Sequence, residues 1–291
     1  MDLLTTAEAA DYLRLGERKL YELVAENRIP CSKVTGKWLF PRHELDRWVN
    51  SGLARPAGMT APEPPPIVGG SQDDLLEWSL RQAGTGLASL TEGTENGVAR
   101  LLRGEVAAAA IHFHGDHADA NIAAVSTMPQ LHDAVLVGFA QREQGLLLPL
   151  GNPRSLSSLA DVLGSRARMA VRQPGAGADM LLGLLLDSCG ASRSDLNRLQ
   201  SPCLTGPDLA AAVRTGRADC GIATRSAALA AGLDFVPLAW ENFDLLMRQR
   251  TYFQPSMQAL VRYLEQDGFS RRATELTGYD TSPAGQIRFF S

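Results

Sequence analysis

Residues 4–30 read LTTAEAADYLRLGERKLYELVAENRIP, and this stretch decides how the N-terminal part of the chain folds. The segment from residue 3 to residue 13 predicts a short helix. Thr5 or Thr6 can cap its N-terminus, and Glu8 stands where the acid of a capping box would help. A helix with these signals forms locally and can begin a small helical unit.

A tight turn separates this helix from the next. Gly16 is free to take a left-handed conformation there, because glycine has no Cβ atom to clash. A second helix starts at residues 17–24 and ends near residues 27–28. Two β-prone runs within residues 33–41 predict a hairpin wing, and residues 43–50 predict a third helix. Two short helices joined by a glycine turn form a helix-turn-helix, whose second helix is suited to the major groove of DNA.

The basic side chains gather on the second helix and the wing. The chain holds three lysines, and all of them lie within residues 1–55. That segment has nine basic and eight acidic side chains, so the placement of charge matters more than its near-neutral sum. We predict DNA contacts from seven side chains of the second helix and the wing. They are Arg18, Lys19, Tyr21, Arg28, Lys33, Lys37 and Arg42.

Residues 4–49 resemble the excisionase-like and MerR-like winged helix-turn-helix domains. The resemblance implies binding to double-stranded operator DNA. A small helical interaction domain without a role on DNA is the alternative. The resemblance is carried by LTTAEAADYL (residues 4–13), KLY (19–21), RIP (28–30), GKWLF (36–40) and LDRW (45–48).

Length and composition describe an ordinary globular protein with room for two domains. The 291 residues are 45% hydrophobic and 21% charged, with a net charge of −4, so DNA binding cannot rest on bulk charge. The four cysteines form no Cys-x-x-Cys pair, which favours reduced core thiols over zinc or disulfides. The sequence has neither an apolar signal segment nor an apolar run long enough to span a membrane, and we therefore expect a cytoplasmic protein.

A proline-rich segment marks the domain boundary. Residues 56–66 read PAGMTAPEPPP, which suits a semi-rigid extended spacer rather than a helix or central strand. We expect a winged helix-turn-helix domain over residues 1–55, a linker over residues 56–66, and a ligand-sensing domain over residues 67–291.

From residue 67 onward, strands alternate with helices. Strands at residues 66–70, 86–90 and 107–113 enclose two helices, a βαβαβ pattern that implies a parallel sheet with right-handed crossovers. Residues 132–139 and 145–150 read as two further strands.

A second copy of this pattern begins at residue 169. It predicts strands at residues 169–173 and 218–223, with helices at residues 180–189 and 207–216. Residues 235–238 and 243–247 then lead out to a terminal helix at residues 256–267. Two βα lobes with a ligand cleft between them fit this order.

This α/β arrangement resembles the type II periplasmic-binding-protein fold, in the version fused to regulators, over about residues 67–270. It is most similar to the subgroup related to molybdate- and tungstate-binding proteins. The resemblance is carried by GGSQD (residues 69–73), LRGEVAAAAIH (102–112), VRQPGAG (171–177), GRADCGIA (216–223), LDFVPL (233–238) and FDL (243–245).

Four loops predict an anion site, because each of them follows a strand and leads into the N-terminus of a helix. Helix N-termini offer unpaired N–H donors and a positive dipole end, and Arg172 can add a bidentate guanidinium. The resemblance implies a small oxyanion, such as molybdate or tungstate, and no cofactor. The predicted ligand-binding residues are Ser71, Thr94, His112, Arg172, Gly175, Gly177, Thr224 and Ser226.

Two features of the sequence leave the identity of the ligand open. Relatives often carry Ser and Thr in the loop where this chain has Ala176 and Ala178, so either the ligand differs or backbone donors suffice. His112, His114 and His117 resemble a metal cluster, but we favour a solvated loop with His112 at the cleft edge and predict no metal site.

We find no nucleophile elbow, P-loop or dinucleotide fingerprint, and so expect no enzyme. The leading hypothesis is a one-component transcription regulator that senses a small oxyanion, as a homodimer or higher homo-oligomer. A cytoplasmic binding protein whose N-terminal domain contacts other proteins is one alternative. An enzyme of molybdenum-cofactor handling is another.

Overall fold

The computed structural model describes residues 2–33, 36–51, 63–115 and 119–291. The chain divides into two compact units, Met1–Pro62 and Glu63–Ser291. Most of the predicted linker lies outside the described residues.

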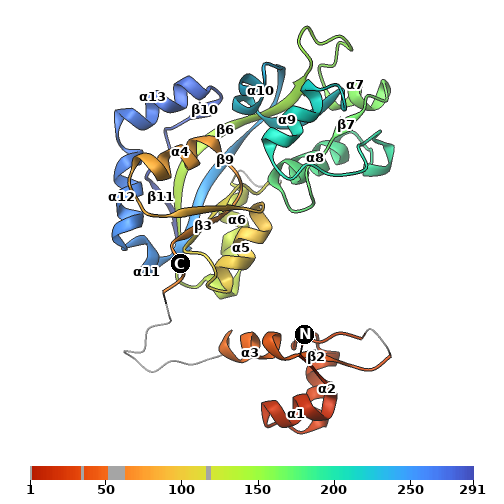
Figure 1. Cartoon of the computed structure of the whole chain (residues 1–291), viewed down its shortest axis with the longest axis vertical. Helices are drawn as coiled ribbons and strands as arrows, with labels where there is room; N and C mark the ends of the chain where they lie inside the picture. Colours follow the sequence, from red (N-terminus) through yellow and green to blue (C-terminus); the bar gives the residue numbers. More distant parts are fainter. Residues whose placement is uncertain (1, 34–35, 52–62, 116–118) are drawn as a thin grey trace. The chain divides into compact units, whose positions relative to one another are not determined.

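The first unit is a small helical domain with one pair of short strands (Figure 1). Strand β1 pairs with β2 in antiparallel fashion, with Leu4 opposite Phe40. The elements are β1 (Leu3–Leu4), α1 (Thr6–Leu13), α2 (Glu17–Ala25), β2 (Phe40–Pro41) and α3 (Arg42–Ser51).

The capping box predicted for the first helix is present. The side chain of Thr5 accepts from the Glu8 N–H at 3.4 Å, and the Glu8 carboxylate accepts from the Thr5 N–H at 2.8 Å. The left-handed residue of the turn is Arg14, with φ 55°, whereas Gly16 has φ −72° and caps α2. The prediction for Gly16 was therefore wrong. The chain reverses directly at the end of α1, where the Arg14 N–H returns to carbonyl groups of that helix.

One apolar cluster holds the helices and the base of the wing together. Leu20, Phe40 and Leu45 are fully buried in it. Ser32 and Leu39 exchange backbone hydrogen bonds of 2.8 Å, which fixes the base of the predicted wing. The tip residues Val34 and Thr35 lie outside the described residues.

The second unit is built around one curled sheet with strand order β4-β3-β5-β9-β6-β8-β7. Strands β10 and β11 pair with β6. The strands are β3 (Ile67–Gly70), β4 (Ala88–Thr91), β5 (Ala108–Ile111), β6 (Ala134–Leu148), β7 (Met169–Ala170), β8 (Cys220–Thr224), β9 (Asp234–Arg248), β10 (Tyr279–Asp280) and β11 (Ile287–Phe290). The helices are α4 (Asp74–Gln82), α5 (Thr94–Leu102), α6 (Ala120–Ser126), α7 (Leu159–Gly164), α8 (Gly177–Ser188), α9 (Gly206–Arg214), α10 (Arg225–Ala231), α11 (Gln249–Tyr252), α12 (Pro255–Leu264) and α13 (Asp267–Leu276), with short 3₁₀ turns η1 (Pro129–Leu131) and η2 (Arg193–Asp195).

Two long antiparallel strands, β6 and β9, run through the whole unit (Figure 1). At one end β9 pairs with β5, and at the other end β6 pairs with β8. This pair of long strands therefore joins two lobes. We call the part with β3, β4, β5 and β11 the first lobe, and the part with β7 and β8 the second lobe.

Each long strand had been predicted as two separate segments. The polar run QREQ at residues 141–144 lies between the two predicted parts of β6, and residues 239–242 lie between those of β9. In the structure these residues stay paired, with Arg142 opposite Glu241, and register shifts lie next to Gly138 and Gly145. Their side chains are polar because they lie where one lobe passes into the other.

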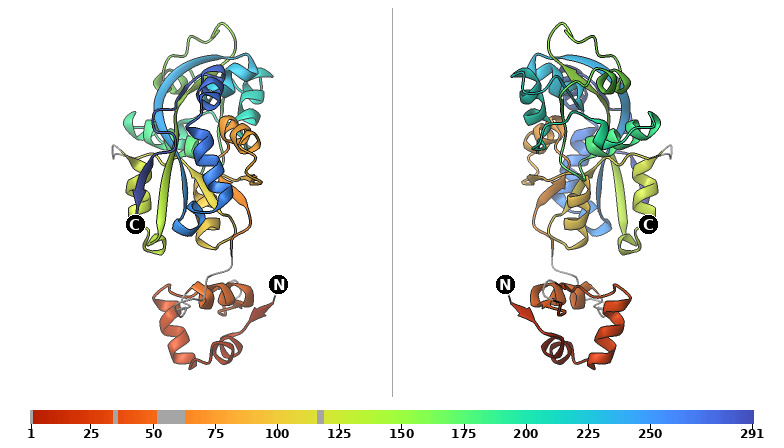
Figure 2. Two further views of the ribbon diagram at one scale, coloured as in Figure 1. Left: turned by 90° about the vertical axis from the view of Figure 1, so that its left-hand side faces the viewer. Right: turned by 90° about the vertical axis from the view of Figure 1, so that its right-hand side faces the viewer.

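Helices cover both faces of the sheet in each lobe (Figure 2). In the first lobe, α4, α12 and α13 contribute to one apolar cluster, and α5 and α6 to the other. Successive residues of β6 divide between them: Val135 and Val137 face the first cluster, Ala134 and Leu136 the second. In the second lobe, α7 and α8 cover one face and α9 and α10 the other. The predicted two-lobed α/β architecture and its parallel βαβαβ start are confirmed.

Several local predictions differ from the structure. Residues 91–97 were predicted as a loop, but helix α5 begins at Thr94, so residues 94–97 are helical. The helix predicted to be terminal is followed by α13, β10 and β11. All four cysteines are free, but Cys189 is exposed, so it is not a core thiol. Within the described ranges, no helix is long and apolar enough to cross a membrane.

Candidate functional site

A small cavity opens where the strands of both lobes end. Strands β3 and β5 of the first lobe and β8 of the second lobe reach it with their carboxyl ends, each leading into polar residues. The cavity volume is about 30 Å³, which suits a ligand of few atoms. In open α/β sheets, ligands bind at this edge because strand ends and helix N-termini meet there.

Ser71, Thr94 and His112 come from three segments of the first lobe and meet at the cavity. The hydroxyl groups of Ser71 and Thr94 lie 2.8 Å apart, and the His112 N–H donates to Thr94 Oγ1 at 3.2 Å. Ser71 and His112 line the cavity, whereas Thr94 is fully buried behind them. Thr94 therefore positions the two lining residues.

Thr224 and Ser226 come from the second lobe, at the start of α10. Thr224 lines the cavity and caps α10, and its hydroxyl lies 2.9 Å from that of Ser226. Ser226 is buried and contacts the Tyr279 hydroxyl at 3.4 Å. The Tyr279 hydroxyl in turn donates to Asp73 at 2.9 Å, so Ser226 contributes to a link between the lobes.

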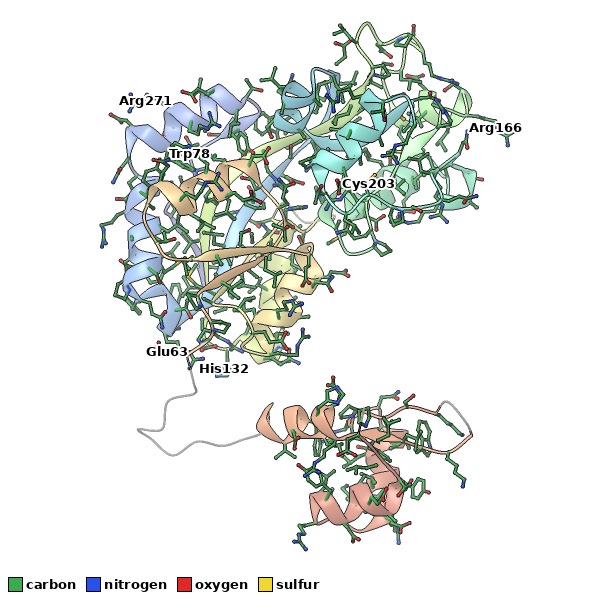
Figure 3. The ribbon with its side chains drawn as sticks, in the orientation of Figure 1. Glu63, Trp78, His132, Arg166, Cys203 and Arg271 are labelled. Carbon is green, nitrogen blue, oxygen red and sulfur yellow. The ribbon has the colours of Figure 1, made fainter. Side chains whose placement is uncertain are left out.

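Arg172 lines the cavity without a carboxylate partner. Its Nε donates to Gln173 Oε1 and to the Cys203 carbonyl, both at 3.2 Å, and its Nη2 donates to the Leu204 carbonyl at 2.8 Å. Figure 3 marks Cys203 on the side of the second lobe that faces the first. No carboxylate of the described residues lies within 4 Å of the guanidinium. Burial, and then Arg142, lower the pKa of Arg172 to about 10, so it stays charged at neutral pH.

The two predicted glycines hold the lobes close together. A Cβ atom on Gly177 would lie 1.5 Å from His112 Cδ2, so the imidazole ring packs directly on this backbone. The Gly175 carbonyl accepts from the Glu95 N–H at 3.4 Å. Gly177 lines the cavity, whereas Gly175 forms a contact between lobes beside it.

The sequence analysis missed Arg142, the central charged group of the site. Its side chain is 1% exposed and is paired with two carboxylates, Asp73 at 2.9 Å and Glu241 at 2.6 Å. It also contacts His112 through Nη2. Arg142 is thus neutralised within the protein, and it joins β6, β9 and the start of α4.

The Glu241 carboxylate keeps its charge because of these contacts. Burial opposes ionisation of Glu241, yet the charge of Arg142 and the hydrogen bond with His114 outweigh it and hold the pKa of that carboxyl well below its usual range. Burial holds the pKa of His112 well below its usual range, with Arg142 acting in the same sense, so the ring is neutral at pH 7.

Asp73 and Asp74 lie at the start of α4. Asp73 caps α4 by accepting from the Leu76 N–H at 2.8 Å. Asp74 lies in the first turn and lines the cavity. Burial, followed by the charge of Asp73, raises the pKa of Asp74.

The histidines form no metal site in the part of the chain that is described. His114 Nε2 lies 2.8 Å from the Glu241 carboxylate, and the rings of His112 and His114 are 6.0 Å apart. No group of three metal-ligating side chains occurs among the described residues. His117 lies outside them.

In the first unit, the predicted DNA-contacting residues are on the surface. Arg18 and Lys19, at the start of α2, are paired with Glu22 at 3.5 and 3.1 Å. Such exposed ion pairs contribute little to the free energy of folding. The basic side chains can therefore leave Glu22 and contact a DNA phosphate instead. Tyr21 is 49% exposed on the same helix.

The remaining predicted contacts surround the wing. Arg28 pairs with Glu26 at 3.0 Å, and Lys33 lies over the Trp38 ring at 5.1 Å. Arg42 lies over the Tyr12 ring at 4.9 Å, and Lys37 is exposed. These placements leave the basic groups accessible, and their contacts with DNA remain predictions.

Both units match known families. Residues 77–265 match the family described as the PBP superfamily domain, over more than half of the chain. The chain belongs to the PBP superfamily domain family. Residues 3–52 match a family described as a helix-turn-helix domain. The predicted fold class is thereby confirmed.

The PBP-superfamily chain is similar over nearly its whole length to a Bacillus subtilis (strain 168) relative, Uncharacterized protein YvgK. The two are 24% identical over 300 residues, which cover 97% of this chain and 96% of the relative.

Solved structures of low identity share the fold of the second unit. A substrate-binding protein with bound phosphate from Clostridium perfringens has a TM-score of 0.55 at 10% identity, covering 74% of this chain and 98% of that one. The tungstate ABC transporter protein from Geobacter sulfurreducens has a TM-score of 0.52 at 13% identity, with coverages of 72% and 98%. The effector-binding domain of QuiR in complex with shikimate has a TM-score of 0.50 at 10% identity, with coverages of 72% and 96%.

Proposed function

We propose that this protein is a ligand-responsive transcription regulator that binds operator DNA and senses a small oxyanion, with molybdate and tungstate as first candidates. The observation that carries the proposal is a combination within one chain. A helix-turn-helix domain is joined to a two-lobed domain whose cavity holds Arg172 without a carboxylate partner. A half-buried cation of this kind favours an anion, because charge-assisted hydrogen bonds are stronger than neutral ones.

The ligand acts by favouring one arrangement of the lobes. Ser71 and His112 belong to the first lobe, and Arg172 and Thr224 to the second, so a ligand held by all four favours the closed form. Residues 1–55 are the proposed DNA-binding part and residues 67–291 the sensor. The proposed linker, residues 56–66, joins these two parts in the sequence.

The DNA half is tested by mobility shift with a pool of genomic fragments, with and without molybdate, tungstate, sulfate and phosphate. We expect selective binding that changes when one anion is added. The Arg18→Ala, Lys37→Ala double variant should weaken binding by about tenfold or more, since two cationic contacts are lost. The matched control, Arg198→Ala with Arg262→Ala, removes two exposed arginines of the second unit. Unchanged DNA binding in the folded double variant would refute the assignment.

The ligand half is tested by calorimetry on the full chain. Arg172→Ala should weaken anion binding by roughly 1.5–3 kcal/mol, or about tenfold and more, because a charge-assisted contact is removed. Arg198→Ala, which changes an exposed arginine of the same lobe, should leave affinity within about twofold. Anion binding without any DNA binding would favour the alternative of a binding protein whose N-terminal domain contacts other proteins.

A further inference from the structure

The wall of the cavity contains a buried hydrogen-bond acceptor that has no donor. Gln144 lines the cavity and is 2% exposed, and its Oε1 is buried without a partner among the described residues. Burying such an oxygen unsatisfied costs free energy, which a donor on a ligand would recover.

The orientation of this amide is fixed by its neighbour. Gln144 Nε2 donates to Glu241 Oε1 at 2.9 Å, and the same oxygen accepts from Arg142 Nε at 2.6 Å. The pKa of Glu241 lies well below its usual range, so its carboxylate is ionised and can only accept. The NH₂ end of Gln144 must therefore face Glu241, and the oxygen is the end left without a partner.

Asp74 provides a second acceptor in the same wall. Among the described residues, Gln72 Nε2 donates to its carboxylate at 2.7 Å, and no cation lies within 4 Å of it. Arg172 on the second lobe is the cation of the cavity without a carboxylate partner. The lining residues thus include one cation without a carboxylate partner, Arg172, one acceptor without a donor, Gln144, and one carboxylate without a cation within 4 Å, Asp74.

We infer that the ligand is a small anion that carries its own hydrogen-bond donor, an O–H or N–H group. This inference rests on the proposed anion-sensing function, and it replaces the first candidates, molybdate and tungstate, by anions that carry a donor. The anionic oxygen contacts Arg172, and the donor faces Gln144 and Asp74. Sulfate, molybdate and tungstate carry no proton at neutral pH, so they would leave Gln144 Oε1 unsatisfied and bring negative charge towards Asp74. Hydrogen phosphate and small hydroxy acids have both groups.

The test uses pairs of anions that differ in the donor. Calorimetry on the full chain at pH 7.5 compares hydrogen phosphate with sulfate and molybdate, and glycolate with acetate. At least one donor-carrying anion should bind ten times more tightly than its donor-free counterpart, and the pair that shows this identifies the source of the donor. Equal or tighter binding of sulfate, molybdate or tungstate would overturn this inference and leave the proposed function standing. A chain that binds none of the anions would overturn both.

Variants of the acceptors provide an independent readout. Asp74→Asn should lower the preference for the donor-carrying anion about tenfold, because an amide can itself donate and brings no charge. Glu77→Gln makes the same change one turn later on α4, away from the cavity, and should leave the preference unchanged. Gln144→Leu should weaken the donor-carrying anion more than the donor-free one. A preference unaltered in both cavity variants, with melting curves like those of the unmodified chain, would exclude these acceptors as the cause.

Discussion

Asp244, on β9 of the first lobe, is a fully buried acid in an unusual environment. One of its oxygens accepts from Arg288 Nη1 at 2.5 Å and from Asn121 Nδ2 at 2.8 Å, and the other has no partner in the described part of the chain. Burial is the largest influence and raises the pKa of Asp244 to about 6, although the charge of Arg288 acts in the opposite direction. The fold therefore favours the protonated acid more than the unfolded chain does.

This shift predicts how stability depends on pH. The folded pKa lies above the ordinary value near 3.8, so between about pH 4 and pH 6 the folded state holds a proton that the unfolded state has lost. Stability should then fall as the pH rises through this window, by about 1–3 kcal/mol from this group. Urea unfolding at pH 4.5 and 7.5 should show that Asp244→Asn loses less free energy of unfolding between the lower and the higher pH than the unmodified chain does. Asp187→Asn, an exposed acid on α8, is the control. Identical pH slopes for Asp244→Asn and the unmodified chain would contradict this reading.

At the scale of elements, the N-terminus of α8 decides how closely the lobes approach. Gly177→Ala places a methyl group where the His112 ring packs, so α8 must move away from the first lobe. We expect the anion affinity to fall at least about tenfold, because donors from the two lobes no longer converge. Gly183→Ala, on the same helix, meets its nearest atom at 3.6 Å and should bind as the unmodified chain does. The two variants separate lobe closure from helix propensity, since both replace a helical glycine. Equal affinities in the two variants would show that the contact between lobes is not needed.

The elements that were predictable are those with a strong local pattern. The capping box of α1, the βαβαβ start and the loops of the cavity could be read from the residues. Of the predicted ligand-binding residues, Ser71, His112, Arg172, Gly177 and Thr224 line the cavity. Arg142 escaped prediction because its polar run resembles a loop, and only the pairing of β6 with β9 reveals a strand. Strands β10 and β11 were missed for a similar reason, since they are short and depend on β6, which lies about 140 to 155 residues earlier in the chain.

For the whole molecule, we predict a homodimer or a higher symmetric oligomer. A DNA-binding unit of some fifty residues makes few contacts, and linking two of them on a palindromic site raises affinity without new contacts. Light scattering at tens of micromolar should give at least twice the mass of one chain, and footprinting should protect two half-sites related by symmetry. A mass of one chain, with and without DNA, would count against this prediction.

The order of strands in the sheet also determines which lobe can fold first during synthesis on the ribosome. Residues 149–233 form most of the second lobe as one uninterrupted stretch, whereas the first lobe needs β9 and then β10 and β11 from the end of the chain. During synthesis the ribosome therefore releases the parts of the second lobe long before the first lobe can close. Until then, β6 has an open edge that later strands will cover, and open strand edges are where chains pair wrongly. A truncation that ends the chain before residue 279 would remove Tyr279 and β11 together, which leaves that edge open permanently and Asp73 without its phenolic donor.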